Sequence, residues 1–324
     1  MVTTDYHEPV LLAETLGQLD LKSGSVIIDG TLGGGGHAEA ILDHTGPDGI
    51  LIGLDLDSDA IREAATRLRG YGERVRLFQS SFRRIDDIAA EIAPTSIDGI
   101  VLDLGVSSHQ LDAPERGFRF GTTGDPGSVA SESPLDMRMD GLGDRPPASS
   151  LLATWSAEKL EKIFSKYGQL PGSRRLANGI IDRRKSEPLE TAADLVHLIR
   201  ELGIGRGRKH NPATLVFQAL RIAVNDELGA LEEGLQAAIR VLRPGGRLAV
   251  IAYHSLEDRL VKQTFRAAAK GCTCPPEWPA CACGIEPTLK LLTRRPIVPD
   301  GGEIEKNPRA RSARLRAAAR LEAA

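Results

Sequence analysis

The chain has 324 residues, of which 41% are hydrophobic and 26% are charged, and its formal net charge at pH 7 is −3. This length supports a large core in one domain or two, and the charge excludes a polycation. No run of about 18 apolar residues occurs, and the first ten residues are polar and acidic, so we expect neither a membrane span nor a secretory signal. The few cysteines fit a reducing environment, and we therefore expect a cytoplasmic protein.

Apolar, β-branched runs alternate with helical patterns over the first hundred residues. We predict strands at 25–30, 49–57, 74–79 and 97–105, and helices at 36–46, 58–72 and 82–92. Ser58 is the predicted N-cap of the second helix. Strands that are apolar throughout suit a sheet buried on both faces. The alternating order indicates an α/β fold with a doubly wound parallel sheet.

The alternation stops after Gly105 and resumes much later. A polar, Gly/Ser-rich stretch covers 121–133, only helical patterns follow until about residue 205, and a Pro-Gly-Gly turn then leads into a strand within 242–255. We predict a discontinuous domain, residues 1–108 and 212–324, interrupted by an inserted, mostly helical domain, residues 109–211.

Basic residues concentrate in two segments. Residues 166–185 carry six basic residues and one acid, and residues 294–324 carry eight basic residues and four acids. Such clusters are commonly solvated helix faces. Two of them in one chain also suit a polyanionic partner, so both interpretations stay open at this point.

Four consecutive glycines, 33–36, separate the first predicted strand from its helix. Glycines let a ligand lie against bare backbone, and the helix N-terminus that follows offers unpaired N–H groups. Asp29, Asp55 and Asp103 each end a predicted strand. The carboxyl ends of parallel strands meet at one crevice, so we expect the three carboxylates to converge there.

Two ligands fit this arrangement, a dinucleotide and S-adenosylmethionine. The single Gly-x-Gly-x-x-Ala match at 33–38 is a weak dinucleotide signal. Carboxylates at Asp29 and Asp103 would repel a pyrophosphate, whereas they favour the ammonium and sulfonium of S-adenosylmethionine. Asp55 is placed to accept hydrogen bonds from ribose hydroxyls. The residues favour S-adenosylmethionine, and a nicotinamide-dependent oxidoreductase is the alternative.

Six motifs follow one another along the chain: DGTLGGGGH (29–37), LDLGVSSHQLD (102–112), ERGFRF (115–120), PLDMRMD (134–140), YHSLEDR (253–259) and NPRARSA (307–313). Together they resemble the RsmH/MraW family of bacterial small-subunit ribosomal RNA (cytosine-N4-)-methyltransferases, over nearly the whole chain. The resemblance implies a class I S-adenosylmethionine-dependent methyltransferase, with a Rossmann-like doubly wound sheet and an inserted all-helical substrate-recognition domain.

The resemblance also implies where the cofactor is bound. Asp29 is a candidate cofactor contact only because it ends a predicted strand. Phe82 follows the third predicted strand, where an aromatic ring can flank adenine. A purely structural place in the core is the alternative for Phe82. His37 is not expected to act as a base, because the positive cofactor disfavours its protonation. The contacts implied at matching positions are Gly35, Gly36, His37, Asp55, Phe82, Asp103 and Gln110.

The implied substrate is a cytidine in the decoding region of 16S rRNA in the small (30S) ribosomal subunit, methylated on N4. That nitrogen is a poor nucleophile, because its lone pair is delocalised into the ring. Asp103 is the candidate catalytic acceptor for its N–H; whether Asp103 contacts this amine or only the cofactor stays open. The target base has to leave its stack. Candidate substrate-binding residues are Ser107, Ser108, His254, Ser255, Arg309 and Arg311, the arginines through phosphates.

Three alternatives stay open at this stage. Ser255 and Glu257 could serve only to cap the helix that follows the resumed strand. The whole protein could be a non-catalytic S-adenosylmethionine-binding ribosome-assembly factor, although the intact acids at Asp29, Asp55 and Asp103 argue against this. A homodimer is a further open possibility.

The four cysteines lie within twelve residues, at Cys272, Cys274, Cys281 and Cys283. Four thiolates beside a Pro-Pro turn could hold a structural zinc ion, with two disulfides as the alternative. One residue inside each pair is tighter spacing than zinc ligands usually show. We therefore predict no metal site firmly and keep structural zinc as an open alternative.

Overall fold

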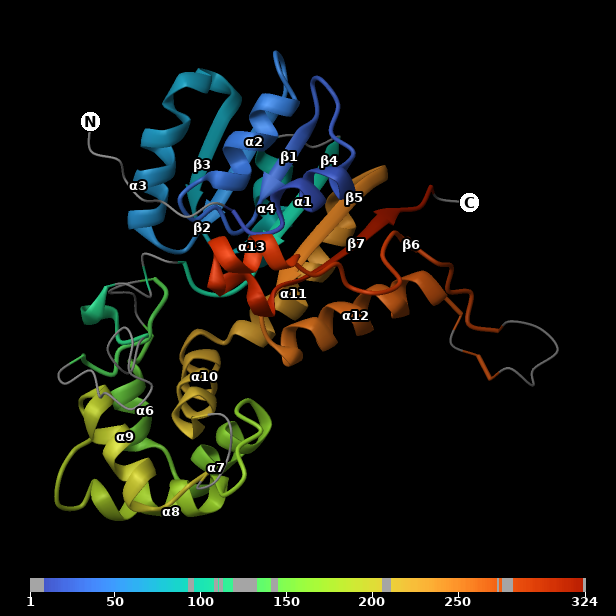
Figure 1. Ribbon diagram of the computed structural model, residues 1–324. Coiled ribbons are helices and arrows are strands. Elements are labelled where there is room, and N and C mark those ends of the chain that lie inside the picture. Colours follow the sequence, from blue (N-terminus) through green and yellow to red (C-terminus); the bar gives the residue numbers. More distant parts are fainter. Residues whose placement is uncertain are drawn as a thin grey trace. The chain divides into compact units, whose positions relative to one another are not determined.

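The computed structural model describes residues 9–92, 96–107, 110, 113–118, 133–140, 145–205, 211–272, 274–275 and 282–322 (Figure 1). The chain divides into two compact units, one made of residues 1–105 and 228–324 and the other of residues 106–227. Among the described residues, no helix combines the length and the apolar character needed to cross a bilayer.

The first unit is built on a seven-stranded sheet in the order β3-β2-β1-β4-β5-β7-β6. Neighbouring strands among β1 to β5 pair in parallel, while β7 runs antiparallel to both β5 and β6, between which it lies (Figure 1). This confirms the predicted doubly wound α/β sheet. The strands are β1 Val26–Asp29, β2 Ile50–Asp55, β3 Val75–Gln79, β4 Ile97–Asp103, β5 Leu242–Ala252, β6 Leu289–Leu291 and β7 Arg314–Arg320.

Both faces of the sheet are covered, as the continuously apolar strands predict. Neighbouring residues of β1 face opposite ways: Ile28 joins an apolar core with α4, α11 and α12, and Ile27 joins one with α1, α2 and α3. Both side chains are almost completely buried. The helices of this unit are α1 Leu12–Leu19, α2 Gly36–His44, α3 Ser58–Arg67, α4 Ile85–Ile92, α11 Glu227–Val241, α12 Ser255–Lys270 and α13 Gly301–Lys306, with short 3-10 turns η1 Leu68–Arg74, η2 Phe82–Arg84 and η4 Pro308–Ser312.

The N-cap of α3 differs from the prediction. Asp57, not Ser58, occupies the capping position, and its carboxylate accepts a 3.0 Å hydrogen bond from the N–H of Asp59. Both residue types cap helices well, so the pattern alone did not decide between two adjacent candidates.

The second unit packs helices around its own core, which includes Leu160, Phe164 and Leu176. Its described regular structure is helical, apart from an isolated β-bridge between Pro134 and Thr191. The buried side chain of Asn225 donates to the carbonyl of Met137 at 2.7 Å and accepts from the N–H of Met139 at 2.8 Å. Its helices are α6 Ala148–Thr154, α7 Ala157–Lys166, α8 Ser173–Arg183, α9 Ala192–Glu201 and α10 Pro212–Asn225, with a 3-10 turn η3 Pro114–Arg116.

Candidate cofactor and active site

Three carboxylates lie at the ends of three adjacent strands. The register of the parallel sheet places Asp29 of β1 opposite Gly53 of β2 and Val101 of β4. Asp55 lies two residues after Gly53, and Asp103 lies two residues after Val101. Because side chains alternate between the two faces of a strand, Asp55 and Asp103 lie on the same face of the sheet as Asp29. The convergence predicted from the sequence is therefore present, and it arises from register.

The glycine turn between β1 and α2 adopts conformations that favour glycine. Gly33 and Gly35 have φ values of +50° and +80°, and Gly35 is the N-cap of α2. A Cβ on Gly36 would approach the ring of Pro9 to 3.2 Å. The backbone of the turn thus follows a path on which side chains would be strained or crowded.

Asp55 holds this turn in place. Its Oδ2 accepts a 2.8 Å hydrogen bond from the N–H of Gly33, and its Oδ1 accepts one of 2.9 Å from the N–H of Asp57. Burial raises the pKa of Asp55 to about 6, although these bonds act in the opposite direction. Each oxygen keeps a second lone pair, so Asp55 can also accept from a ligand.

Asp29 is the most deeply buried of the three acids, at 2% exposure. Its Oδ1 accepts from the N–H of Thr31 at 3.1 Å. Burial raises its pKa to about 7; the bond from Thr31 lowers it, and the nearby charges of Asp103 and Asp55 raise it further. Since no described cationic side chain pairs with Asp29, its charged form is disfavoured until positive charge is bound nearby.

Asp103 is fixed from both its backbone and its side chain. Its N–H donates to the hydroxyl oxygen of Thr31 at 2.6 Å, and its Oδ1 accepts from the hydroxyl of Tyr253 at 2.9 Å. Burial raises its pKa to about 7, against the lowering effect of the Tyr253 bond and with the added repulsion of Glu257. The side chain stays 23% exposed, so a ligand can reach it.

His37 lies beside Asp103 and is neutral. Its Nε2 is 3.1 Å from the carbonyl oxygen of Val10, which assigns the ring proton to Nε2. Its Nδ1 is 3.8 Å from Oδ2 of Asp103, beyond hydrogen-bond distance. Burial lowers the pKa of His37 to about 4, which agrees with the expectation that it is no base.

Phe82 lies at the start of η2, where its side chain packs on two glycines. A Cβ on Gly234 of α11 would come within 2.4 Å of the ring, and one on Gly30 within 3.2 Å of the Cβ of Phe82. The ring is only partly buried against the core. Phe82 thus has a packing role, and its contact with adenine stays a prediction.

Two predicted residues belong to the second unit. The N–H of Ser107 donates to Oε1 of Gln110, and the N–H of Gln110 donates to the hydroxyl of Ser107, both at 3.1 Å. These two hydrogen bonds hold Ser107 and Gln110 together after the end of β4. Ser108 lies outside the described residues.

His254, Ser255 and Glu257 form the start of α12. His254 is the N-cap: its Nδ1 accepts from the N–H of Glu257 at 3.3 Å, and the carboxylate of Glu257 accepts from the N–H groups of Tyr253 and His254. Ser255 is the exposed first helical residue. A histidine at the cap position is unusual, and this explains why the sequence pointed to Ser255 instead.

The C-terminal arginines have different environments. Arg316 donates to Asp258 at 2.6 Å and Arg314 does so at 3.3 Å, and both Arg316 and Asp258 are buried. Although burial raises the pKa of Asp258, these arginines hold it below its usual value. Arg309 is half-buried in η4, and Arg311 is exposed.

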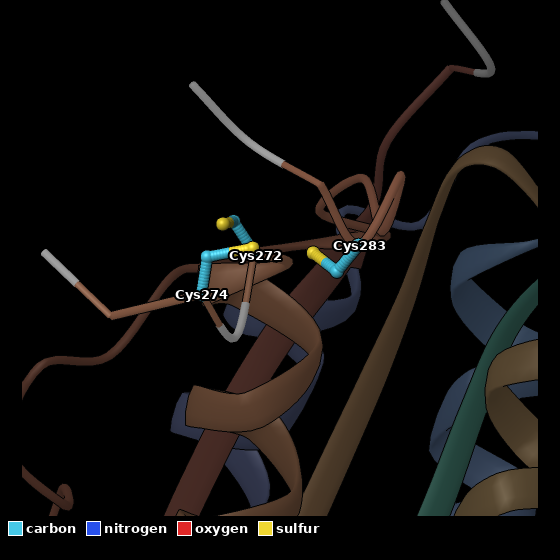
Figure 2. A group of neighbouring side chains, drawn as sticks. All are labelled: Cys272, Cys274 and Cys283. Atoms are coloured by element: carbon cyan, nitrogen blue, oxygen red, sulfur yellow. The ribbon is translucent and has the colours of Figure 1, made fainter. Parts of the chain in front are cut away.

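Three of the four cysteines gather after α12. The sulfur atoms of Cys272, Cys274 and Cys283 all lie within 4.8 Å of one another (Figure 2). Cys281 lies outside the described residues. The cluster is far in sequence from the three strand-end acids.

Sequence reasoning missed Thr31 and Tyr253 as parts of the site. Both residues form hydrogen bonds with Asp103. Thr31 lies at the start of the glycine turn, and Tyr253 follows β5, the strand beside β4. Recognising Tyr253 required knowing that β5 pairs with β4, which the local pattern does not reveal.

A doubly wound sheet with carboxylates and a glycine turn at its strand ends is typical of Rossmann-like ligand-binding domains. The chain belongs to the MraW methylase family, whose model matches residues 4–321. This confirms the resemblance that the six motifs indicated.

The chain is similar along its length to curated proteins named ribosomal RNA small subunit methyltransferase H. It is 47% identical over 321 residues to the protein of that name from Symbiobacterium thermophilum, covering 98% of each chain. With the one from Geobacter sulfurreducens it shares 48% identity over 318 residues, covering 97% of this chain and 99% of the relative.

Proposed function

We propose that this protein transfers a methyl group from S-adenosylmethionine to the N4 amino group of one cytidine in the decoding region of 16S rRNA, in the small ribosomal subunit. Membership of a methylase family and relatives named for small-subunit ribosomal RNA methylation support the reaction class. The observation that carries the proposal is the set of three register-matched carboxylates beside a glycine turn.

These residues fit S-adenosylmethionine better than a dinucleotide. Asp29 and Asp103 have pKa values raised to about 7, so a bound cation stabilises their charged forms, and a pyrophosphate would meet repulsion. The ammonium and sulfonium of S-adenosylmethionine supply that cationic charge. Asp55 would accept from the ribose hydroxyls, while Gly35 and Gly36 bring bare backbone to the ligand.

The remaining cofactor assignments follow the family resemblance. His37 would contribute a neutral, fixed imidazole beside Asp103, and Phe82 would flank the adenine with the part of its ring that packing leaves uncovered. Gln110 also stays a predicted contact. S-adenosylmethionine supplies the methyl group on a sulfonium, so the work left to the protein is alignment, which can contribute roughly 7–11 kcal/mol.

Asp103 is the residue we propose to act on the acceptor. Tyr253 occupies its Oδ1, and Oδ2 accepts no hydrogen bond from the described residues. An N–H of the cytosine amino group can donate to Oδ2, which draws the nitrogen lone pair out of conjugation and receives the proton released after the N–C bond forms. A positioned acceptor of this kind typically contributes about 10²–10⁴ in rate.

We propose exposed arginines for the contacts with RNA phosphates. Within residues 166–185, Arg183 and Lys185 form ion pairs and Arg184 donates to the carbonyls of Leu152 and Trp155. The exposed Arg174 of the second unit and Arg311 of the first are better suited to bind an RNA backbone. We propose the second unit as the substrate-recognition domain.

Two measurements test the function. Small subunits from a strain lacking the gene should accept one tritiated methyl from labelled S-adenosylmethionine, and mass mapping should place it on N4 of a decoding-region cytidine. A non-catalytic assembly factor would bind S-adenosylmethionine without transfer. A nicotinamide-dependent oxidoreductase would instead bind a dinucleotide in calorimetry, and either outcome would overturn the proposal.

A further inference from the structure

The three described cysteines form a cluster that the methyl-transfer site does not use. Cys272 and Cys274 follow the C-terminus of α12, and Cys283 precedes β6, so the cluster joins two segments separated by eight residues. Figure 2 shows the three side chains gathered there, with those of Cys274 and Cys283 pointing toward each other.

The distances suit one small ion. In a tetrahedral zinc site with Zn–S bonds of about 2.3 Å, neighbouring sulfur atoms are roughly 3.8 Å apart. All three sulfur atoms here lie within 4.8 Å of one another, so small side-chain rotations suffice to reach that geometry. The close spacing inside Cys272-x-Cys274, which weakened the sequence argument, does not keep the sulfur atoms apart.

A backbone group also contacts one of the sulfur atoms. The N–H of Ala282 points at the sulfur of Cys274 with an N–S distance of 3.3 Å. Such outer contacts hold a metal ligand in a fixed orientation. The cysteines are half-buried, which lets an ion enter while limiting the water around it.

We propose that Cys272, Cys274 and Cys283 bind a structural zinc ion that ties the end of α12 to the segment before β6. Three thiol protons leave to solvent as three Zn–S bonds form, with no change of oxidation state. Soft thiolate donors select zinc over magnesium or calcium. Water or another donor completes the tetrahedron. The ion serves the fold and takes no part in methyl transfer.

Metal analysis of the purified full-length chain tests this proposal. Protein prepared without chelators should contain about one zinc per chain by plasma mass spectrometry. Cys272→Ser, Cys274→Ser and Cys283→Ser should each lose most of it. Ala282→Ser is the matched control: it places a hydroxyl in the same exposed loop but keeps every thiol and the backbone N–H, so it should retain the zinc.

A second measurement does not depend on whether the variants fold. Titration of the wild type with an organomercurial, in the presence of a coloured zinc indicator, should release zinc in proportion to the thiols consumed. Cobalt exchanged into the wild type should show thiolate-to-metal charge-transfer absorption. Far less than one zinc per chain in the wild type, or full zinc in the triple Cys→Ser variant, would overturn the proposal.

Discussion

The hydroxyl of Tyr253 donates a 2.9 Å hydrogen bond to Oδ1 of Asp103 and so joins the ends of the neighbouring strands β5 and β4. This bond lowers the pKa of Asp103, while burial, the larger effect, raises it to about 7. Only the ionised carboxylate can take up the proton that the amino group releases. Tyr253 therefore sets the pH range over which Asp103 can act.

Tyr253→Phe should make methyl transfer require higher pH. A hydrogen bond to a charged group contributes about 1.5–3 kcal/mol, which corresponds to about one to two pH units. Because the lost bond lowered the pKa of Asp103, the acidic limb of the kcat profile should move upward by that amount. Activity should drop about tenfold near neutral pH and recover at alkaline pH.

Tyr71→Phe is the matched control for Tyr253→Phe. Its hydroxyl also donates to a carboxylate, Asp43, but on the exposed surface of the first unit. This variant should leave the pH profile unchanged. A Tyr253→Phe profile that coincides with the wild type would mean that Asp103 does not titrate in the reaction.

Asp103→Asn should lower kcat by about 10²–10⁴, the usual contribution of a positioned proton acceptor. The amide oxygen can still accept from Tyr253, so the fold and the strand ends should persist. Single-turnover transfer from labelled S-adenosylmethionine measures the chemical step, and calorimetry measures cofactor binding separately. Loss of binding with an unchanged chemical step would assign Asp103 to the cofactor alone.

Gly35→Ala should destabilise the protein by about 1–2 kcal/mol, because its φ of +80° is strained for any residue with a Cβ. It should also weaken S-adenosylmethionine binding, because the new Cβ would contact Ala64 of α3 at 3.4 Å and the strained turn would shift. Gly17→Ala is the control: Gly17 lies inside α1 with open space around it, and alanine there should be neutral or stabilising. Urea unfolding measures both; equal effects would contradict the strain argument.

Asp29→Asn should flatten the pH dependence of stability in the ligand-free protein. The folded pKa of Asp29, about 7, lies above its ordinary value of 3.8, so the native state binds this proton more tightly than the unfolded state. Its contribution to stability therefore falls as pH rises from about 4 to about 7. His37, with its pKa lowered to about 4, acts in the opposite direction between about 4 and 6.5.

The difference between variant and wild type isolates Asp29 from His37. Thermal unfolding should show the asparagine variant more stable near pH 8, by a gain on the order of 1.4 kcal/mol per unit of pKa relieved, and equal to the wild type near pH 4. S-adenosylmethionine should reduce the difference in the wild type by supplying positive charge. A constant offset at all pH values would show that Asp29 does not change its charge.

Arg316→Met and Arg311→Ala should separate folding from RNA binding. Arg316 and Asp258 are a buried pair, and removing one partner typically costs about 3–5 kcal/mol; Arg314 keeps the loss near the lower end. Arg311 is exposed, so its loss should change stability by less than about 0.5 kcal/mol. Only Arg311→Ala should weaken binding to small subunits while reducing its salt dependence. Chemical unfolding and filter binding check both.

Local patterns predicted the sheet and its strand-end acids well, because strands buried on both faces are apolar throughout and each acid directly follows such a run. They did not identify Tyr253 as a partner of Asp103, since that contact depends on β5 entering the sheet beside β4 after a long insertion. Sequence distance hides such a neighbour from any local pattern.

The number of basic residues in a segment was a poor guide to which of them could bind RNA. Of the arginines in the two basic segments, Arg184 holds carbonyl groups and Arg316 neutralises a buried acid, so their charges serve the fold. A composition count cannot separate such residues from an exposed one like Arg311. The cysteine spacing did not show that the sulfur atoms of Cys272, Cys274 and Cys283 lie within 4.8 Å of one another, because a residue count along the chain says little about distances in space.

Strand β7, near the end of the chain, is an interior strand of the sheet, between β5 and β6. During synthesis, the edge of β5 that pairs with β7 stays unpaired until residues 314–320 have emerged from the translating ribosome. The helical unit of residues 106–227 has by then been complete for some time and can fold first. A stop codon placed just before residue 314 would therefore take away an inner strand and yield a misassembled product.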